Sequence, residues 1–475
     1  MDFTGGYIAE RWTPIWAEAY GNWKGMAFLD GVEPPSWVIG DLVREAGHAG
    51  MSPVILGEKG EEHTVRFIHA ADIHLDANGL IREYRPKGMD LSNVSHQQLA
   101  SIEHVGKIPS IQKDVAMRTK SATDLPLEFE DISCEWLSQA LSQRYPGVEV
   151  ISFTCDGEMH TTSSKARLRL AYNDVGQRAG LPPSMYIKGG FSPRVLKRIW
   201  GGLAIEVRFF AEIAPQMQVN LPRCYFAQVD EKSRQGIVLL EDLTARGVTF
   251  GVPTRPLSPD RVAAMLELMA KYHGQWWNEP RLPQYAAAKE PLHIFMKWQW
   301  RRDWWNKVME MPVAAYLPSE LRNADLVERA METLWELNEL QPQTYVHADP
   351  HLGNSYFETD GAPGLLDWQC SMRGPWAHDV SYFMTGALSV EDRRAFERDL
   401  LKQYLGALRA SGGEPPSFDQ AWLQHRRQMM HGLSLAVPTA HEQLSEANTV
   451  AYSYRFSQAA ADLDVLQSLG LKRSG

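Results

Sequence analysis

Cysteine is scarce in this chain of 475 residues, which contains only four. They are far apart and form no Cys-x-x-Cys pair: Cys134, Cys155, Cys224 and Cys370. A disulfide framework is typical of short chains with several cysteines, and a structural zinc site needs paired ligands, so neither is expected. This cysteine usage is typical of the reducing cytosol, and we predict a cytoplasmic protein.

Long hydrophobic runs and an excess of positive charge are also missing. No window of about 18 uninterrupted apolar residues occurs, so no membrane span is expected. The first residues, MDFTGGYIAERW, lack the basic region and apolar run of a signal peptide, which predicts a protein that is not exported. With 48 Lys and Arg against 58 Asp and Glu, the net charge is −10. Bulk attraction to nucleic acid or to an anionic membrane is therefore not expected.

What the chain does have is the composition of a globular protein, with 44% hydrophobic, 22% charged and 10% aromatic residues. At roughly 150 residues per domain, its length predicts about three globular units. Tryptophan is abundant, with 16 residues. An account of the function should explain where these tryptophans lie.

Residues 1–100 are interpreted as a separate α+β unit. Apolar residues at three- and four-residue spacing predict a helix over 7–20. Two extended runs, the first over 64–75, flank Asn-Gly at 78–79, a dipeptide typical of a hairpin turn. The polar and mixed sequence over 101–125 has no sustained apolar face and is interpreted as a linker.

The remainder divides into a sheet-rich part and a helical part. Over 126–245, a helix is predicted at 133–144, and the extended runs that follow surround a further helical segment, 203–213, which predicts a small sheet with one helix laid on it. Residues 246–475 are mainly helical, and the clear interruption is 345–368. Helices are predicted over 258–272, 323–340, 390–408, 418–435 and 447–469.

The interruption carries a set of polar residues suited to phosphoryl transfer. A short apolar run leads into His347 and Asp349, Asn354 follows, and a second run ends at Asp367. In phosphoryl transfer, one carboxylate accepts the proton of the attacking hydroxyl, while an amide oxygen and a second carboxylate hold Mg²⁺. The HxDxxxxN spacing matches the catalytic loop of kinases. Each residue alone could be an ordinary turn residue, but the set predicts Asp349 as catalytic and Asn354 and Asp367 as metal ligands.

The segment HADPHLGN, at 347–354, resembles the HGDxHxGN motif of the aminoglycoside phosphotransferase and choline kinase superfamily. LDWQ at 366–369 resembles the magnesium motif of that superfamily, and Gly374-Pro375 followed by Asp379 resembles its next segment. The chain departs from the family at Ala348, where glycine is usual. Alanine suits this position if its φ angle is negative, and we therefore expect a negative φ there.

This resemblance implies a bilobal protein-kinase-like fold, α+β in class. The small β-rich N-lobe would be 126–245, the large helical C-lobe 246–475, and the N-terminal α+β unit would be appended to them. ATP and Mg²⁺ are the implied cofactors. His347, His351 and Asp379 are the implied supporting residues of the site.

The N-lobe would supply the nucleotide contacts. Lys188 ends an extended run and resembles the phosphate-pairing lysine of the family, and Glu206 resembles its helix partner, with Glu212 as the competing candidate. The segment VLLEDL resembles the family hinge, in which backbone groups of Glu241 and Leu243 would meet the adenine edge.

The expected loop over the phosphates has no GxGxxG motif. Small polar residues can instead offer N–H and hydroxyl groups to phosphate oxygens, and Ser163 and Ser164 are the candidates here. An ordinary polar hairpin is an equally good interpretation of this segment.

The segment from Gly274 through Trp305 contains six tryptophans. In this superfamily, helices between the hinge and the catalytic loop commonly shape the acceptor pocket, and an aromatic wall would favour a bulky apolar acceptor. The alternative is that these residues are helix core. Stacking on nucleic acid bases is disfavoured by the acidic net charge. The residues predicted to line the pocket are Trp276, Trp277, Trp300 and Trp304.

The hinge and Glu206 segments are most similar to the ecdysteroid-kinase-like branch. The resemblance implies an enzyme that phosphorylates a hydroxyl group of a lipophilic small molecule, such as a steroid or xenobiotic alcohol. Two alternatives stay open: an antibiotic-resistance kinase acting on aminoglycosides or macrolides, and a catalytically silent nucleotide-binding scaffold. No nucleic acid partner is expected.

The N-terminal unit resembles a SnoaL or NTF2-type domain in its leading helix and hairpin. Domains of this kind serve as enzymes, as ligand holders or as dimer interfaces. A homodimer through this unit is therefore one of the expectations.

Overall fold

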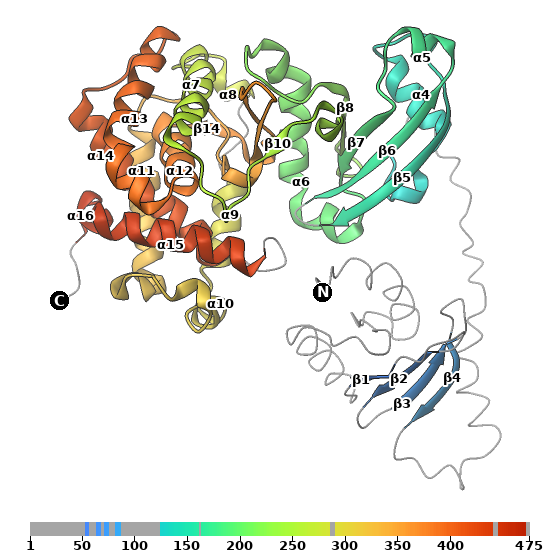
Figure 1. The fold of residues 1–475 in the computed structure, drawn as a ribbon, viewed down its shortest axis with the longest axis horizontal. Coiled ribbons are helices and arrows are strands. Elements are labelled where there is room, and N and C mark those ends of the chain that lie inside the picture. The colour runs from blue at the N-terminus through green and yellow to red at the C-terminus, as the bar shows by residue number, and fades with distance from the viewer. Residues whose placement is uncertain are drawn as a thin grey trace. The chain divides into compact units, whose positions relative to one another are not determined.

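The computed structural model describes residues 124–160, 163–285, 290–439 and 445–471, together with four strands nearer the N-terminus. The chain divides into two compact units, Met1–Thr119 and Lys120–Gly475. Figure 1 shows the strands of the first unit in blue and the second unit in colours from cyan to red. None of the helices described is long and apolar enough to cross a bilayer.

The described part of the first unit is an antiparallel sheet. Its strands, in sheet order, are β1 (Pro53–Leu56), β2 (His63–Phe67), β3 (Ala71–Leu75) and β4 (Ile81–Pro86). The predicted pairing of two extended runs around 78–79 is confirmed, since β3 pairs antiparallel with β4. The run 64–75 is not one strand: it folds back so that Thr64 pairs with His74. The predicted helix over 7–20 lies outside the described residues, and the NTF2-like fold and homodimer stay predictions.

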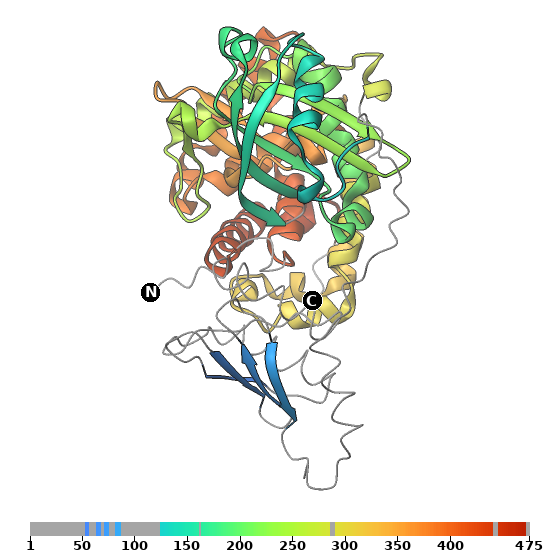
Figure 2. The same ribbon diagram turned by 90° about the vertical axis from the view of Figure 1, so that its right-hand side faces the viewer.

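The N-lobe of the second unit is built on a five-stranded antiparallel sheet in the order β5-β6-β7-β9-β8. Its strands are β5 (Val150–His160), β6 (Ser164–Tyr172), β7 (Ser184–Gly189), β8 (Cys224–Asp230) and β9 (Gln235–Glu241). Its helices are α4 (Cys134–Ser142), α5 (Asp174–Arg178) and α6 (Pro193–Arg208), with a 3₁₀ turn at Phe129–Asp131, a π-helical turn at Phe209–Ile213 and a 3₁₀ turn at Ala214–Gln216. Figure 2 views this sheet with the helices of the C-lobe behind it.

Helix α6 begins ten residues earlier than the predicted segment 203–213. Pro193 occupies its first turn, where proline needs no hydrogen-bond partner for its nitrogen and is typical of a helix start. The helix contacts β9 and also the turn Trp368–Cys370 of the C-lobe. Figure 1 accordingly shows α6 between the sheet and the C-lobe helices.

Buried and less buried side chains alternate along β6, so the two faces of the N-lobe sheet differ. Side chains at every second position are buried: Ser164, Ala166, Leu168, Leu170 and Tyr172. The apolar members of this set share a core with Trp136 and Leu137 of α4. The intervening side chains, Lys165, Arg167 and Arg169, are half-buried or exposed and lie on the opposite face.

The C-lobe is mainly helical. Its helices are α7 (Pro259–Gln275), α8 (Leu282–Tyr285), α9 (Glu290–Gln299), α10 (Arg302–Val308), α11 (Ala324–Glu339), α12 (Trp376–Ala387), α13 (Val390–Ala410), α14 (Phe418–Ala436), α15 (Glu446–Asp462) and α16 (Val465–Ser468). All twelve residues of α12 are buried. A helix that is mostly apolar on every side is suited to such a central position.

Most predicted C-lobe helices match the observed ones, and the last one differs. The predicted helix 447–469 is two helices, α15 and α16, because Asp464 adopts a left-handed backbone conformation with φ of 47°. Aspartate tolerates this conformation better than most residues, and it ends the regular helical path.

Short strands interrupt the helices where the sequence predicted. Strand β11 (Thr344–Val346) pairs with β14 (Met372–Gly374), and β12 (Ser355–Phe357) lies between β10 (Thr249–Phe250) and β13 (Pro363–Leu365). Along the chain, the 3₁₀ turn Leu352–Asn354 lies between β11 and β12, and the 3₁₀ turn Trp368–Cys370 lies between β13 and β14. The other 3₁₀ turns of this lobe are Leu243–Arg246, Pro312–Ala314 and Ser319–Arg322.

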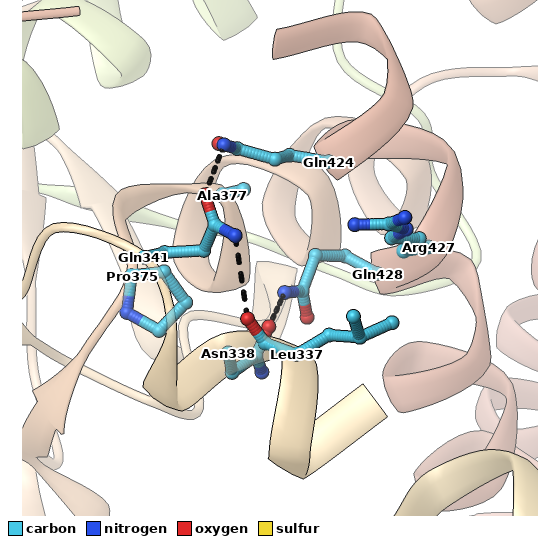
Figure 3. Close-up of a pocket in the computed structure, with 8 residues that line it drawn as sticks. All are labelled: Leu337, Asn338, Gln341, Pro375, Ala377, Gln424, Arg427 and Gln428. Atoms are coloured by element: carbon cyan, nitrogen blue, oxygen red, sulfur yellow. Dashed lines mark hydrogen bonds between the residues drawn. The ribbon is translucent and has the colours of Figure 1, made fainter. Parts of the chain in front are cut away.

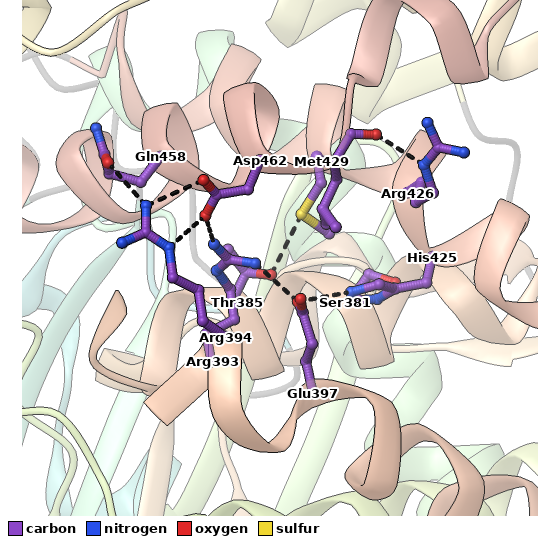
Figure 4. A network of polar contacts seen from close by, with 11 residues as sticks. Ser381, Thr385, Arg393, Arg394, Glu397, His425, Arg426, Met429, Gln458 and Asp462 are labelled. Atoms are coloured by element: carbon purple, nitrogen blue, oxygen red, sulfur yellow. Dashed lines mark hydrogen bonds and ion pairs between the residues drawn. The ribbon is translucent and has the colours of Figure 1, made fainter. Parts of the chain in front are cut away.

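A buried ion-pair network ties α13 to α14 and α15 (Figure 4). The Arg393 side chain is 1% exposed and donates to Glu397, 2.8 Å away, and to Asp462. Asp462 also pairs with Arg394, at 2.7 Å. Burial raises the pKa of Glu397, but hydrogen bonding from His425 and the Arg393 charge outweigh it, so the pKa lies below its usual value.

A cavity between α11 and α14 is too small to be an acceptor site. It is lined by Leu337, Asn338, Gln341, Pro375, Ala377, Gln424, Arg427 and Gln428, and its water-accessible volume is about 10 Å³. Figure 3 shows that the amide side chains in it bond to one another, with Gln428 Nε2 donating to Asn338 Oδ1 over 2.7 Å. Such a volume holds at most about one water molecule, so the cavity is part of the helix packing.

Candidate functional site

The loop between β11 and β12 is held in place by a buried aspartate of α12. Asp379 accepts hydrogen bonds from the backbone N–H of His347, at 2.7 Å, and from that of Ala348, at 2.9 Å. The Tyr272 hydroxyl donates to the same carboxylate over 2.8 Å. Burial raises the pKa of Asp379, but hydrogen bonds from His273 and His378 outweigh this effect and hold the pKa well below its usual range. Asp379 is therefore a charged anchor for the loop.

This anchor explains why the φ angle of Ala348 differs from the predicted one. We expected a negative φ for an alanine in place of glycine, and the observed φ is +67°. To reach the two oxygens of Asp379, consecutive N–H groups of His347 and Ala348 must point to one side, which requires a tight turn. A non-glycine residue in this region carries strain of about 1–3 kcal/mol, which the surrounding contacts must overcome.

His347 joins this loop to the segment that carries Asp367. Burial lowers the pKa of His347, so its imidazole is neutral at neutral pH. Its Nε2 lies 3.0 Å from the Leu366 carbonyl oxygen, and its Nδ1 lies 3.3 Å from the backbone N–H of Asp349. A neutral ring with its proton on Nε2 satisfies both contacts.

Asp349 lies at the end of the anchored loop. Burial raises its pKa well above its usual value, the negative charge of Asp367 raises the pKa further, and a hydrogen bond with Tyr382 opposes both effects. The Asp349 side chain keeps 26% of its surface accessible. Its carboxylate is thus raised in basicity and reachable by a hydroxyl group.

His351 lies beside Asp349 without forming an ion pair with it. The Nε2 atom of His351 is 3.9 Å from Asp349 Oδ2. Burial lowers the pKa of His351 to about 4, so the ring is uncharged at neutral pH. Its Nδ1 is 3.4 Å from the Tyr452 hydroxyl, which also accepts from the Gly353 N–H over 3.3 Å.

Asn354 and Asp367 come together at the same end of the site. The side-chain amide of Asn354 donates to the Asp349 carbonyl over 2.9 Å, and the N–H of Leu366, the residue before Asp367, donates to the Asn354 carbonyl over 3.0 Å. Because the Asn354 amide nitrogen is engaged, the side-chain oxygen is the end left to face a cation. One carboxylate and one amide oxygen match the protein share of a magnesium site in which phosphate oxygens and water complete the shell.

The site also joins the two lobes through three charged side chains. The Lys188 ammonium lies 2.8 Å from Glu206 Oε2 and 2.7 Å from Asp367 Oδ1. Burial lowers the pKa of Lys188, but the charges of Asp367 and Glu206 outweigh it, so the pKa lies above its usual value and the group is charged. Burial likewise raises the pKa of Asp367, and the Lys188 charge reverses the shift, so Asp367 is ionised.

Glu206, and not the competing Glu212, is the residue that the structure brings to Lys188. Glu206 is 2% exposed and lies near the end of α6. Glu212 is exposed and lies in the π-helical turn that follows.

The predicted hinge lies at the end of β9. The Glu241 N–H donates to the Arg223 carbonyl over 2.8 Å, and its side chain pairs with Arg246 over 2.8 Å. Leu243 begins the 3₁₀ turn, which is capped by the Asp242 carboxylate accepting from the Thr244 N–H. The Glu241 amide is thus occupied by a backbone partner, and contact with a base through the Glu241 carbonyl or Leu243 stays a prediction.

The two predicted phosphate-loop serines are buried. Ser163 is 2% exposed and Ser164 is 0% exposed. The Ser164 hydroxyl lies 2.8 Å from His160 Nδ1, and the residue pairs with Gly189 across the sheet. The Ser164 side chain therefore belongs to the core face of β6, and a role for these serines in phosphate binding stays a prediction.

The tryptophan cluster divides into core and partly exposed members. Trp276 and Trp300 are each 1% exposed and pack in the main core of the C-lobe. The predicted pocket role of these two is replaced by the core interpretation, because their rings are enclosed by other helices. Trp277 and Trp304 are half-buried, with Trp304 Nε1 donating to the Pro438 carbonyl over 2.9 Å.

The sequence did not predict several side chains that come from distant elements and lie next to the expected site residues. Tyr382 of α12 and Tyr452 of α15 contact Asp349 and His351, and no sequence signal connects these helices to the loop. Lys165 pairs directly across the sheet with Lys188, and Tyr186 lies two positions before Lys188 on the same face. Strand alternation was the signal that could have identified these two residues.

Comparison with known proteins identifies related chains. Residues 186–416 match the model of the family described as "Phosphotransferase enzyme family". The N-acetylmuramate/N-acetylglucosamine kinase of Neisseria meningitidis serogroup B is 33% identical over 213 residues, which cover 42% of this chain and 57% of that relative. The matched region is therefore less than two thirds of the relative's length.

Two solved structures are similar at low sequence identity. A microcompartment-associated aminopropanol kinase has a TM-score of 0.39 and 15% identity, covering 71% of this chain and 99% of its own. A spectinomycin phosphotransferase in complex with ADP and spectinomycin has a TM-score of 0.37 and 14% identity, covering 70% of this chain and 98% of its own.

Proposed function

We propose that the chain, whose residues 186–416 match the phosphotransferase enzyme family, is a member of that family and transfers the terminal phosphoryl group of ATP to a hydroxyl group of a small molecule. The observation that carries the proposal is the cluster of Lys188, Glu206 and Asp367, with Asp349 close enough for Asp367 to raise its pKa. A charged lysine paired with a glutamate, a carboxylate that can hold Mg²⁺ and a second carboxylate that can accept the hydroxyl proton are the groups that phosphoryl transfer uses in kinases.

The role assigned to Asp349 is to accept the proton of the acceptor hydroxyl group. As the acceptor oxygen bonds to the γ-phosphorus, its proton passes to the Asp349 carboxylate, and the bond from that phosphorus to the β–γ bridging oxygen breaks to leave ADP. A carboxylate of raised pKa is a better proton acceptor than an ordinary aspartate. Its accessible side chain leaves room for this contact.

Nucleotide binding is assigned to groups of both lobes. Lys188, oriented by Glu206, would contact the phosphates, and Asn354 and Asp367 would hold Mg²⁺. When bound, Mg²⁺ would neutralise charge on the phosphate oxygens. The backbone at Glu241 and Leu243 would meet the base, and the anchored loop would keep Asp349 at a fixed place relative to these groups.

The acceptor we propose is a lipophilic or aromatic alcohol, as in the ecdysteroid-kinase-like branch. Tyr382 and Tyr452 beside the loop support an aromatic environment there. A second candidate is an N-acetylated amino sugar, because the relative from Neisseria carries that activity in its name and is 33% identical over 213 residues. An antibiotic acceptor is the further alternative.

A product screen tests the proposal. The purified full chain would be incubated with Mg²⁺ and γ-labelled ATP against steroid alcohols, phenols, N-acetylated amino sugars, aminoglycosides and macrolides, with mass detection of phosphorylated products. Each acceptor would be paired with an analogue that lacks the hydroxyl. Transfer to a hydroxyl compound alone supports the proposal. Absence of both transfer and Mg²⁺-dependent ATP binding in the folded protein would contradict it and favour a scaffold without nucleotide.

A further inference from the structure

Two lysines lie directly opposite each other at the edge of the proposed nucleotide site. Lys165 of β6 is the register partner of Lys188 of β7 in an antiparallel pair. Side chains at such paired positions share a face of the sheet, with Cβ atoms about 4.5–5.5 Å apart. Like charges in this arrangement repel, so the pair needs negative charge on that face.

The lysines differ in exposure. Lys188 is 7% exposed, and its ammonium is already engaged by Glu206 and Asp367. Lys165 is half-buried, and its neighbours Ser164 and Ala166 point to the core face of the sheet. The Lys165 side chain therefore lies on the face that carries the charged cluster and retains access to solvent.

The positive charge of Lys165 interacts electrostatically with the same two carboxylates that Lys188 contacts. Its positive charge contributes to lowering the pKa of Glu206 and that of Asp367. This effect places Lys165 within electrostatic range of the site and agrees with the strand register.

An incoming triphosphate brings more negative charge than Lys188 can balance. The Lys188 ammonium has three N–H donors, and the two carboxylates beside it use them in part. The candidate serines are buried, and the segment between β5 and β6 offers no glycine-rich phosphate cradle. A further cation on the open side of the cluster would share the phosphate charge with Lys188 and Mg²⁺.

We infer that Lys165 is a second phosphate-binding lysine, which contacts the terminal phosphates of the nucleotide in place of a glycine-rich loop. The inference rests on the proposed function, since it requires that a nucleotide binds beside Lys188. The competing role is that of a countercharge for Glu206 and Asp367 without contact to the nucleotide. The two roles differ in how the affinity depends on the number of phosphates.

Calorimetric titration of the full chain with ATP, ADP, AMP and adenosine in the presence of Mg²⁺ separates these roles. Lys165→Met keeps the aliphatic stem and removes the charge. We expect it to weaken ATP binding by about 10- to 100-fold, the range for a hydrogen bond to a charged group, with a smaller loss for ADP and none for adenosine. Lys165→Arg keeps the charge and is expected to retain most of the ATP affinity.

Arg169→Met is the matched control. Arg169 lies on the same strand and face but is exposed and paired with Asp156 over 2.7 Å. This variant also removes one positive charge, and ATP affinity should stay within about twofold, because long-range effects of an exposed charge are screened by salt. Thermal unfolding of each variant verifies that the N-lobe is folded.

The outcomes distinguish this inference from the proposed function. If the parent chain binds ATP and Lys165→Met binds it equally well, or loses ATP and adenosine to the same extent, Lys165 is not a phosphate ligand and the proposed function stands. If the folded parent chain binds no nucleotide, the proposed function fails, and the inference fails with it.

Discussion

Lys188 and Asp367 lie 179 positions apart in the sequence, and the ammonium nitrogen of the first is 2.7 Å from Oδ1 of the second. The contact runs from β7 of the N-lobe sheet to the turn that follows β13 in the C-lobe. Glu206 completes the cluster from α6, the helix that contacts both lobes. The proposed chemistry and the packing of the lobes thus depend on the same three side chains.

Removing the lysine from this cluster should destabilise the fold. Lys188→Met leaves Glu206 and Asp367 without their shared cation, and we expect the free energy of unfolding to fall by about 3 kcal/mol near neutral pH, as for a broken buried ion pair. Urea denaturation measures the difference. Lys402→Met, which breaks an exposed pair with Asp399, should cause no measurable change. Similar losses for both variants would contradict the proposed importance of the cluster.

The Asp379 anchor should show a defined pH dependence. Because the native pKa of Asp379 is depressed, its contribution to stability is fully present above the unfolded pKa of about 3.9 and is lost as the pH falls from there through the lower native pKa. Asp379→Asn places an amide N–H against the N–H groups of His347 and Ala348, and we expect a loss of about 3 kcal/mol near neutral pH. The difference between parent and variant should be constant down to about pH 5 and shrink in stronger acid. A difference that grows with acidification would show that the anchor is not a carboxylate of low pKa.

Tyr382 should set the basicity of Asp349. Its hydrogen bond lowers the raised pKa of Asp349, so Tyr382→Phe should move the acid limb of the rate profile to higher pH. The measurement is kcat/KM against pH with any acceptor found in the product screen. Tyr345→Phe removes another buried hydroxyl, which bonds to Ser371 over 2.7 Å, and should leave the position of that limb unchanged. A shift to lower pH in Tyr382→Phe would overturn this role.

Two tryptophans of different exposure test the assignment of core and surface. Trp300 is 1% exposed, and Trp300→Ala should lower the free energy of unfolding by about 3–5 kcal/mol through the cavity that it leaves. Trp298 is 43% exposed, and Trp298→Ala should have a much smaller effect on stability. Thermal and urea unfolding of both variants provides the comparison. A small stability loss for Trp300→Ala, together with impaired acceptor binding, would restore its predicted pocket role.

The sequence predicted those parts of the site that depend on local spacing. Asp349, Asn354 and Asp367 lie in one short interruption of the helical region, and their order along the chain is enough to suggest their proximity. The pairing of Lys188 with Glu206 was implied by the resemblance of their two segments to those of the phosphotransferase family. Both features need little knowledge of how distant elements pack.

Features that depend on distant contacts could not be predicted in the same way. The positive φ of Ala348 arises from hydrogen bonds to Asp379, 31 positions away. Tyr452 reaches His351 from a helix 101 positions away. An aromatic residue in an amphipathic helix has the same pattern whether it faces the core or a pocket, so the burial of Trp276 and Trp300 required the tertiary structure.

The most direct test of the account is phosphoryl transfer by Asp349→Asn. With γ-labelled ATP, Mg²⁺ and an acceptor identified by the product screen, we expect turnover to fall by about 10²- to 10⁴-fold because the proton acceptor is lost. ATP affinity should stay within about twofold, since Asp349 is assigned to the acceptor and not to the nucleotide. Asp360→Asn, a change in an exposed turn, should leave turnover unchanged. Transfer by Asp349→Asn at the parent rate would contradict the central claim.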